Sequence, residues 1–157
     1  NGGVTFIPAL AGLGAPYWDP HATASILGIT RGTEKGHIAR AALEAIAMRT
    51  REIVIEMQKD ANTTFRTLKV DGGGSTNDLL MQIQSDLLQT EVIRPETTET
   101  TALGAAFFAG LATQYWPSIE SLSSIWKANK KFTPRNEIQN EKIIAAWNKR
   151  MNQLTNL

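Results

Sequence analysis

The stretch TLKVDGGGSTNDLLMQIQ, residues 67–84, joins two kinds of structure through a run of glycines. Its first residues have the composition of a β-strand, and apolar residues recur at helical spacing after the glycines. Between the two lies a turn, Asp71–Ser75, with three consecutive glycines. The predicted buried face of the helix consists of Leu79, Leu80, Ile83 and Leu87. We predict a strand, a glycine turn and a helix, in that order.

Two interpretations of the glycine turn are open. Glycines permit positive φ, so the turn can be no more than a tight connection. Glycines also lack the Cβ that would hold a ligand away from the backbone amides. A helix N-terminus offers unpaired N–H groups and partial positive charge, which suit a phosphate. In open α/β sheets ligands bind at the carboxyl ends of strands, where this turn lies, so a nucleotide is the alternative to a plain turn.

Familiar phosphate-binding motifs do not settle the choice. The P-loop string G-x-x-x-x-G-K-[ST] does not occur. A dinucleotide fingerprint starting at Gly72 would need a third glycine where Asn77 stands, although Glu91 lies at the spacing of its acidic residue. A dehydrogenase would also need this turn on its first strand, whereas a strand and a long helix are predicted before it. Ser75 is the predicted N-cap, with Asp78 completing a capping box.

The rest of the chain alternates strands and helices. Strands are predicted at 3–10, 67–72 and 90–96, and helices at 35–60, 102–112, 118–128 and 137–153. This alternation predicts an α/β fold with parallel strand pairs and right-handed crossovers. Thr33 is the predicted N-cap of the long helix, and Thr100 or Thr101 that of helix 102–112, whose small residues predict a central position. The predicted buried residues of the first and last helices are Ile38, Ala41, Ala42, Ala45, Ile46 and Ile53, and Ile143, Ile144, Trp147 and Met151.

Composition excludes several classes of function. The 157 residues carry a formal net charge of +1, which argues against nucleic acid and anionic membrane as partners. With no cysteine and two histidines, thiolate chemistry is excluded and a zinc site would be poorly supplied. The apolar run at 102–112 is too short to cross a bilayer. The chain begins without methionine or a signal peptide, so we expect a cytoplasmic protein of which this is a fragment.

Three motifs, in order and at matching spacing, resemble those of the FGGY carbohydrate kinase family. ASILGITRGTEKGHIARAALE, residues 24–44, resembles the second family signature. Residues 70–88 are similar to the adenosine motif, and residues 101–112 to the second interdomain-helix motif. GLGAPYWDP (12–20) and GITRG (28–32) are most similar to the members that phosphorylate glycerol. One departure is visible, because Thr23 and Ala24 stand where those members usually carry Arg–Gly.

The resemblance implies a fold and a binding site. The fold is a partial ribonuclease-H-like lobe of the actin and hexokinase type, with C-terminal helices. Residues 1–115 would form the lobe that carries the adenosine-binding turn, and residues 116–157 a C-terminal helical appendage of the same domain. By the family's motif, Gly73 and Asn77 line the nucleotide, and Gly72 and Gly74 complete the predicted cofactor-binding site.

The resemblance also implies an activity. The complete protein would bind ATP or ADP with Mg²⁺ and transfer the γ-phosphoryl group to glycerol, giving glycerol 3-phosphate. The glycerol pocket, the catalytic aspartate, the metal ligands and both phosphate-binding turns are expected before residue 1. We therefore predict no catalytic residue in this chain and no activity from it alone. A dimer or tetramer is expected of the complete protein. The alternatives are another polyol or sugar kinase of the family, or a non-catalytic actin-like module.

Some residues have a simpler interpretation beside a functional one. Asp71 could bind magnesium, but a carboxylate beside a glycine turn more often bonds its own backbone. Tyr17 and Trp18 could stack on adenine, but we favour packing beneath their loop. We interpret His37 as a surface or capping residue.

Overall fold

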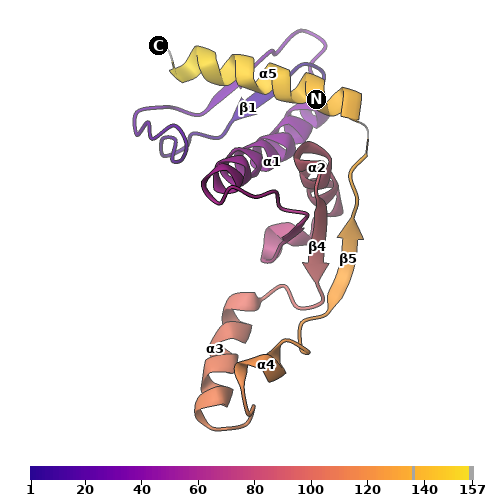
Figure 1. Cartoon of the computed structure of the whole chain (residues 1–157). Helices are drawn as coiled ribbons and strands as arrows, with labels where there is room; N and C mark the ends of the chain where they lie inside the picture. The colour runs from indigo at the N-terminus through magenta and orange to yellow at the C-terminus, as the bar shows by residue number, and fades with distance from the viewer. Residues whose placement is uncertain (136, 156–157) are drawn as a thin grey trace.

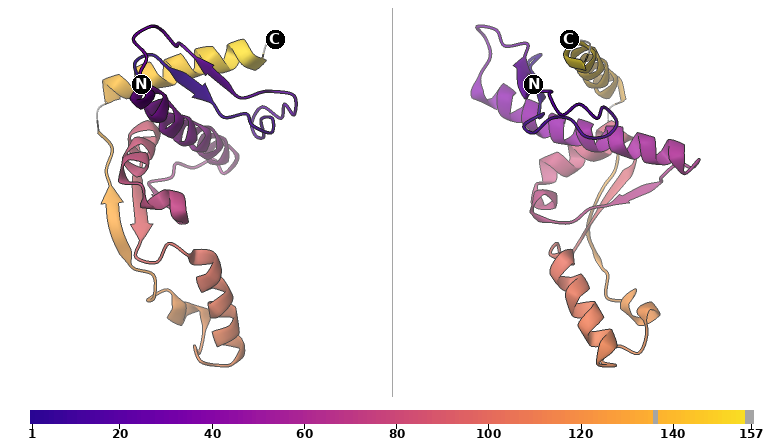
Figure 2. Two further views of the ribbon diagram at one scale, coloured as in Figure 1. Left: turned by 180° about the vertical axis from the view of Figure 1, so that it is seen from behind. Right: turned by 90° about the vertical axis from the view of Figure 1, so that its left-hand side faces the viewer.

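The computed structural model describes residues 1–135 and 137–155 of the chain. Its compact body lies at one end, and one segment extends away from it (Figures 1 and 2). The elements in chain order are β1 (Thr5–Ile7), β2 (Ser25–Leu27), α1 (Lys35–Asp60), β3 (Thr67–Lys69), the 3₁₀ turn η1 (Gly73–Thr76), α2 (Asp78–Leu88), β4 (Glu91–Pro95), α3 (Thr100–Ala112), α4 (Ile119–Leu122), β5 (Ala128–Phe132) and α5 (Glu137–Thr155).

The strands form two small sheets. β1 and β2 pair antiparallel, with Thr5 opposite Leu27. The second sheet has the order β3-β4-β5, in which β3 and β4 are parallel and β5 is antiparallel to β4. The prediction of parallel pairs is therefore correct for β3 and β4 and wrong for the other two pairs.

β5 was not predicted from the sequence. Its residues, ANKKF, have four exposed side chains before the buried Phe132, so they show no alternation of apolar and polar positions. The helix predicted over 118–128 is present only as α4 (Ile119–Leu122), and residue 128 is the first residue of β5. The boundary predicted at residue 115 stays a prediction, although the part beyond it contains a strand as well as helices.

The core lies where α1, α2, β1, β4 and α5 meet. α5 lies across β1 and contacts α2 (Figure 1). The predicted last helix is confirmed, with Trp147 3% and Met151 1% exposed, while Ile143 and Ile144 are half-buried. The apolar side chains of this core larger than alanine are those of Ile7, Leu13, Met48, Leu80, Met81, Ile83, Leu87, Val92, Phe132, Trp147 and Met151.

α1 has the predicted length but a different buried face. Ala41 and Ala45 are buried as predicted, whereas Ile46 and Ile53 are 49% and 43% exposed. Small residues on the inner face let the backbone of α1 approach β1 and α2 closely, which turns the isoleucines outward. Apolar periodicity alone does not distinguish the larger apolar side chains from the alanines that make this contact.

The N-cap of α1 also differs from the prediction. Glu34 occupies the cap position, and its side chain accepts from the backbone N–H of His37. The backbone N–H of Glu34 in turn donates to Nδ1 of His37, 3.1 Å away, which confirms a capping role for this histidine. Thr33 instead accepts a hydrogen bond from the backbone of Thr30 and belongs to the preceding turn.

The carboxylate of Glu52, 9% exposed, joins three parts of the body. Oε1 accepts hydrogen bonds from the Tyr17 hydroxyl at 2.6 Å and from Nε1 of Trp147 at 2.7 Å. Oε2 pairs with Arg49, which also donates to the carbonyl oxygen of Ala15. Burial and the bond to Glu52 raise the pKa of Tyr17 above its ordinary range. The prediction that Tyr17 packs beneath its loop is therefore correct.

Two other expectations are wrong. Trp18 is 76% exposed and does not pack beneath its loop. α3 is not central: it has no buried residue, and Phe108 is 77% exposed. α3 forms the segment that extends from the body, together with α4 (Figure 2).

The small residues of α3 do make one close approach. A Cβ at Gly110 would overlap the ring of Trp116. Trp116 also packs edge to face on Phe107, with ring centroids 5.3 Å apart.

None of the helices within residues 1–135 and 137–155 combines the length and the apolar character of a transmembrane span.

We expect Glu52→Gln to lower the free energy of unfolding by about 3 kcal/mol, because it removes the charge that Arg49 faces in a buried pair. Urea denaturation followed by circular dichroism measures the change. The matched control is Glu56→Gln, which breaks a pair with Lys59 whose side chains are 41% and 64% exposed. That change should cost less than about 1 kcal/mol. Equal losses in the two variants would contradict the role assigned to Glu52.

Candidate functional site

The glycine turn follows directly from the pairing of β3 with β4. The backbone N–H of Val70 donates to the carbonyl of Ile93 at 3.1 Å, one residue beyond the end of β3. The N–H of Gly72 then donates to the carbonyl of Thr98 at 2.9 Å. Gly72 has φ of 73°, in the left-handed region that favours glycine. The chain therefore leaves the sheet at a position where a side chain would add strain.

The next residues form η1, which is closed by two hydroxyl groups. The Ser75 hydroxyl donates to the carbonyl of Gly72 and the Thr76 hydroxyl to that of Gly73, each at 2.7 Å. Ser75 is 2% exposed, so its side chain is an internal part of the turn.

The predicted cap of α2 is therefore wrong. Asn77, not Ser75, is the N-cap, and its Oδ1 accepts from the backbone N–H of Leu80 at 3.0 Å. The extra 3₁₀ turn displaces the start of the helix by two residues and excludes the predicted capping box. Leu80, Ile83 and Leu87 are buried as predicted, but Leu79 is 49% exposed.

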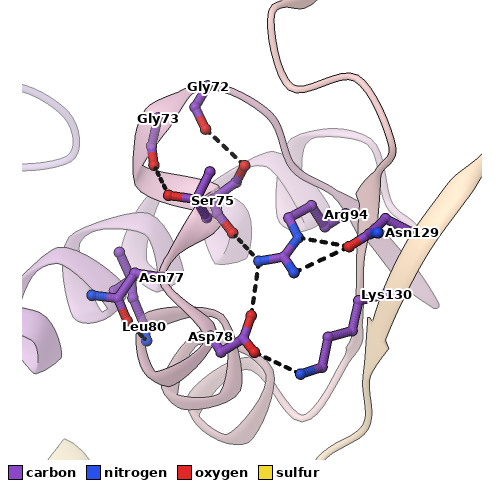
Figure 3. A network of polar contacts seen from close by, with 10 residues as sticks. Gly72, Gly73, Ser75, Asn77, Asp78, Leu80, Arg94, Asn129 and Lys130 are labelled. Carbon is purple, nitrogen blue, oxygen red and sulfur yellow. Dashed lines mark hydrogen bonds and ion pairs between the residues drawn. The ribbon is translucent and has the colours of Figure 1, made fainter.

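Asp78 takes part in an ion-pair network instead (Figure 3). Oδ2 accepts from Lys130 at 2.6 Å and Oδ1 from Arg94 at 2.8 Å. Hydrogen bonds from Lys130 and Arg94 hold the pKa of Asp78 below its usual range. Arg94 also donates to the carbonyl of Ser75 at 2.9 Å, and to Oδ1 of Asn129 at 3.1 and 3.3 Å.

A second connection joins the turn to the start of α3. The carboxylate of Asp71 accepts a hydrogen bond from the Thr100 hydroxyl, so it bonds a neighbouring element rather than its own turn. α3 begins at Thr100 without a side-chain cap, contrary to the prediction for Thr100 or Thr101. In the part of the chain that the structure describes, no three histidine, aspartate or glutamate side chains gather as a metal site would need.

The four residues of the predicted binding site lie together on the outside of this turn. Gly73, Gly74 and Asn77 are exposed and Gly72 is half-buried. A Cβ placed on any of the three glycines would meet no other atom within 4 Å. The Nδ2 group of Asn77 enters none of the hydrogen bonds found among residues 1–135 and 137–155. The turn thus presents open backbone and one amide donor, with no side chain over the glycines.

Sequence reasoning did not identify Arg94, Asn129 or Lys130 as neighbours of the turn. A signal for Arg94 was present, because it is a charged residue that directly follows the apolar pair Val92 and Ile93 in the predicted strand. Asn129 and Lys130 lie on β5, whose pairing with β4 could not be read from its pattern.

Comparison with known proteins identifies close relatives. Residues 1–113 match the FGGY family of carbohydrate kinases, C-terminal domain. The glycerol kinase of Janthinobacterium sp. (strain Marseille) is 53% identical over 150 residues, which cover 95% of this chain and 30% of that protein. The glycerol kinase of Deinococcus radiodurans is 53% identical over 148 residues, 94% of this chain and 30% of that protein. The chain thus spans under a third of the length of these relatives.

Solved structures agree in fold. The crystal structure of Plasmodium falciparum glycerol kinase with ADP superposes with a TM-score of 0.85 at 37% identity, covering 98% of this chain and 31% of that one. Gluconate kinase from Lactobacillus acidophilus, at 24% identity and a TM-score of 0.81, supports the fold alone. The predicted fold class, a partial ribonuclease-H-like lobe, is confirmed.

The lowered pKa of Asp78 gives a pH prediction. The folded state favours the carboxylate form of Asp78. Its contribution to stability is therefore fully present above the unfolded pKa of about 4, and it is lost as the pH falls through the lower pKa of the folded state. Carboxyl-carbon NMR should find the midpoint of Asp78 below the ordinary range. Lys130→Gln should raise this midpoint, whereas Lys142→Gln, which changes an exposed lysine on α5, should not. A midpoint indifferent to Lys130 would contradict the assignment.

Proposed function

The chain belongs to the FGGY family of carbohydrate kinases, and on that premise we propose that it is the nucleotide-binding C-terminal part of an ATP-dependent glycerol kinase. The complete enzyme would transfer the γ-phosphoryl group of ATP to the 3-hydroxyl of glycerol, giving glycerol 3-phosphate. The observation that carries this proposal is the open glycine turn at the end of β3, in a chain 53% identical to glycerol kinases.

The turn would bind the adenine nucleotide through its backbone. Gly73 and Gly74 carry no side chain and have open space above them, so a ligand can approach their amides closely. Because Oδ1 of Asn77 caps α2, its Nδ2 group is the part of the side chain available to the nucleotide, as a hydrogen-bond donor. The glycerol kinase of Plasmodium falciparum, which is similar in fold, was solved with ADP.

The acidic residues beside the turn do not suit Mg²⁺. The Asp71 carboxylate is bonded to Thr100, and Asp78 is neutralised by Arg94 and Lys130. We therefore place the magnesium ligands outside this chain. When bound, the metal would neutralise charge on the phosphates. The chain's own contribution is to bind and orient the nucleoside end of ATP.

Other parts of the proposal concern the complete protein. The catalytic aspartate and the glycerol pocket would lie in the part of the relatives that this chain does not span. The exposed apolar surface of α3 supports a covering partner, which we take to be that same part of the enzyme.

We also propose that the complete protein is a cytoplasmic dimer or tetramer without nucleic-acid or membrane partners. Within this chain, residues 1–115 would form a lobe and residues 116–157 its appendage.

This chain alone should not phosphorylate glycerol, because the groups that position the acceptor are expected elsewhere. A chimera in which it replaces the matching C-terminal part of the Deinococcus radiodurans glycerol kinase should do so. A coupled assay with ATP, magnesium and glycerol measures both. Turnover by the chain alone would refute the first expectation. A folded chimera without turnover, beside an active parent enzyme, would count against the kinase assignment.

Gly73→Val should weaken ADP binding to the turn by about tenfold, about 1.4 kcal/mol, because the added side chain occupies space that the ligand needs. The fold should be unchanged, since a Cβ at Gly73 meets no neighbour. Gly36→Val is the matched control, an equally open glycine in the first turn of α1. NMR titration with millimolar ADP follows the amides of Gly72, Gly74 and Asn77.

In the wild-type chain and the Gly36→Val variant, ADP should shift these amides and few others. Shifts that survive Gly73→Val unchanged would remove Gly73 from the site. Absence of shifts in the wild-type chain would contradict a preformed nucleotide site in this chain.

A further inference from the structure

We propose that Arg94 is a positioning residue, which holds the glycine turn in the shape that binds the nucleotide. The inference rests on the proposed function and adds to it a residue outside the family motifs described above. Arg94 is the fourth of the five residues of β4, and its side chain is 13% exposed. Its hydrogen bonds go to Ser75, Asp78 and Asn129 and to none of the predicted binding residues, so its effect on the site would pass through Ser75 and Asp78 (Figure 3).

One nitrogen of the guanidinium group donates two hydrogen bonds to the turn and the start of α2. Nη1 donates to the backbone carbonyl of Ser75 at 2.9 Å and to Oδ1 of Asp78 at 2.8 Å. Ser75 lies inside η1, and Asp78 is the first residue of α2. These two bonds fix the 3₁₀ turn relative to the helix that Asn77 caps.

The other side of the guanidinium group is anchored to β5. Nε and Nη2 donate to Oδ1 of Asn129 at 3.3 and 3.1 Å, and the group lies over the ring of Phe132, 5.7 Å from its centroid. The planar fork thus connects β4, β5 and the turn with one side chain. Lysine cannot reproduce this arrangement, because its ammonium is a single point of donation on a flexible stem.

The turn needs such support because its own residues supply little. The three glycines have no side chains, and no atom from elsewhere in the fold lies where their Cβ atoms would be. The hydroxyls of Ser75 and Thr76 bond within the turn and leave its position on the sheet unspecified. If the binding-competent shape becomes less populated, the apparent dissociation constant rises by the same factor.

Lys130 provides a matched control for this role. It bonds the same carboxylate as Arg94, on Oδ2 of Asp78 at 2.6 Å, but its side chain is 47% exposed. Lys130 lies 5.2 Å from the centroid of the Phe132 ring, and within residues 1–135 and 137–155 its side chain donates to Asp78 and not to the backbone of the turn. Loss of Lys130 therefore removes a positive charge from the network and keeps the connection to Ser75.

The test measures ADP binding to the wild-type chain, Arg94→Gln, Arg94→Lys and Lys130→Gln by amide NMR titration. Arg94→Gln should raise the dissociation constant about tenfold, since it loses charge-assisted bonds to the turn. Arg94→Lys should recover part of this loss, and Lys130→Gln should change the constant by less than about twofold. Urea denaturation establishes that each variant is folded where binding is measured. A purely structural Arg94 would lower the urea midpoint and leave the affinity of the folded protein unchanged.

A second readout needs no nucleotide. The amides of Gly72 and Ser75 are hydrogen-bonded within or beside the turn. Their hydrogen exchange should be faster in Arg94→Gln than in the wild-type chain, and unchanged in Lys130→Gln. If Arg94→Gln does not fold, Asn129→Ala removes the anchor of the guanidinium group on β5 and should still raise the dissociation constant by about threefold.

The outcomes separate this inference from the function on which it rests. Failure of the wild-type chain to bind ADP would contradict the preformed site, and the inference with it. Wild-type binding with an unchanged constant in Arg94→Gln, or in Asn129→Ala where that variant stands in, would overturn the inference alone. So would an equal loss in Lys130→Gln, because the charge around Asp78 would then be the cause.

Discussion

The buried carboxylate of Glu52 determines how the body of this lobe is assembled. A charge at such a site is tolerated when it is paired and hydrogen-bonded. Its donors come from α1 itself, from the loop that holds Tyr17 and from Trp147 on α5, 95 residues further along the chain. Because all of them must converge on two oxygens, the loop and α5 have little freedom to lie elsewhere on α1. The apolar core then fills the space that this arrangement encloses.

The position of the glycine turn depends on that of α1, because α2 contacts α1 and begins where the turn ends. Alanines bring the two helices together, and two bonds fix their relative position: Gln84 donates to the carbonyl of Ala47 at 3.2 Å, and Arg51 donates to the carbonyl of Leu87 at 2.9 Å. Burial around this second contact lowers the pKa of Arg51. The start of α2, where the turn ends, is therefore set by the body of the lobe. The turn contributes only its backbone and the hydroxyl groups of Ser75 and Thr76 to this arrangement.

Local features were predictable from the sequence, and choices that depend on distant partners were not. The bounds of α1 and the place of the glycine turn follow from periodicity and composition, which act within a few residues. Ser75 and Asn77 are both good N-caps, and the extra 3₁₀ turn that decides between them is bonded to Thr98 and Arg94 from outside the motif. The sequence likewise indicated that α3 is suited to close packing, but it did not indicate what lies against it. β5 is a strand because β4 pairs with it, and its own residues are mostly exposed.

The candidate site combines a rigid boundary with an open centre. On one side, Gly72 and Asp71 are bonded to Thr98 and Thr100, which lead into α3. On the other side, Ser75 and Asp78 are bonded to Arg94. Both sets of bonds attach to the residues that flank Gly73 and Gly74, whose own carbonyls are bonded only within the turn, by Thr76 and Asn77. The flanking residues therefore keep the two glycines in place. A backbone held in this way can accept a ligand against its amides without losing any contact that maintains the fold. The absence of side chains at the centre of the turn and the concentration of polar bonds at its edges are therefore two parts of one arrangement.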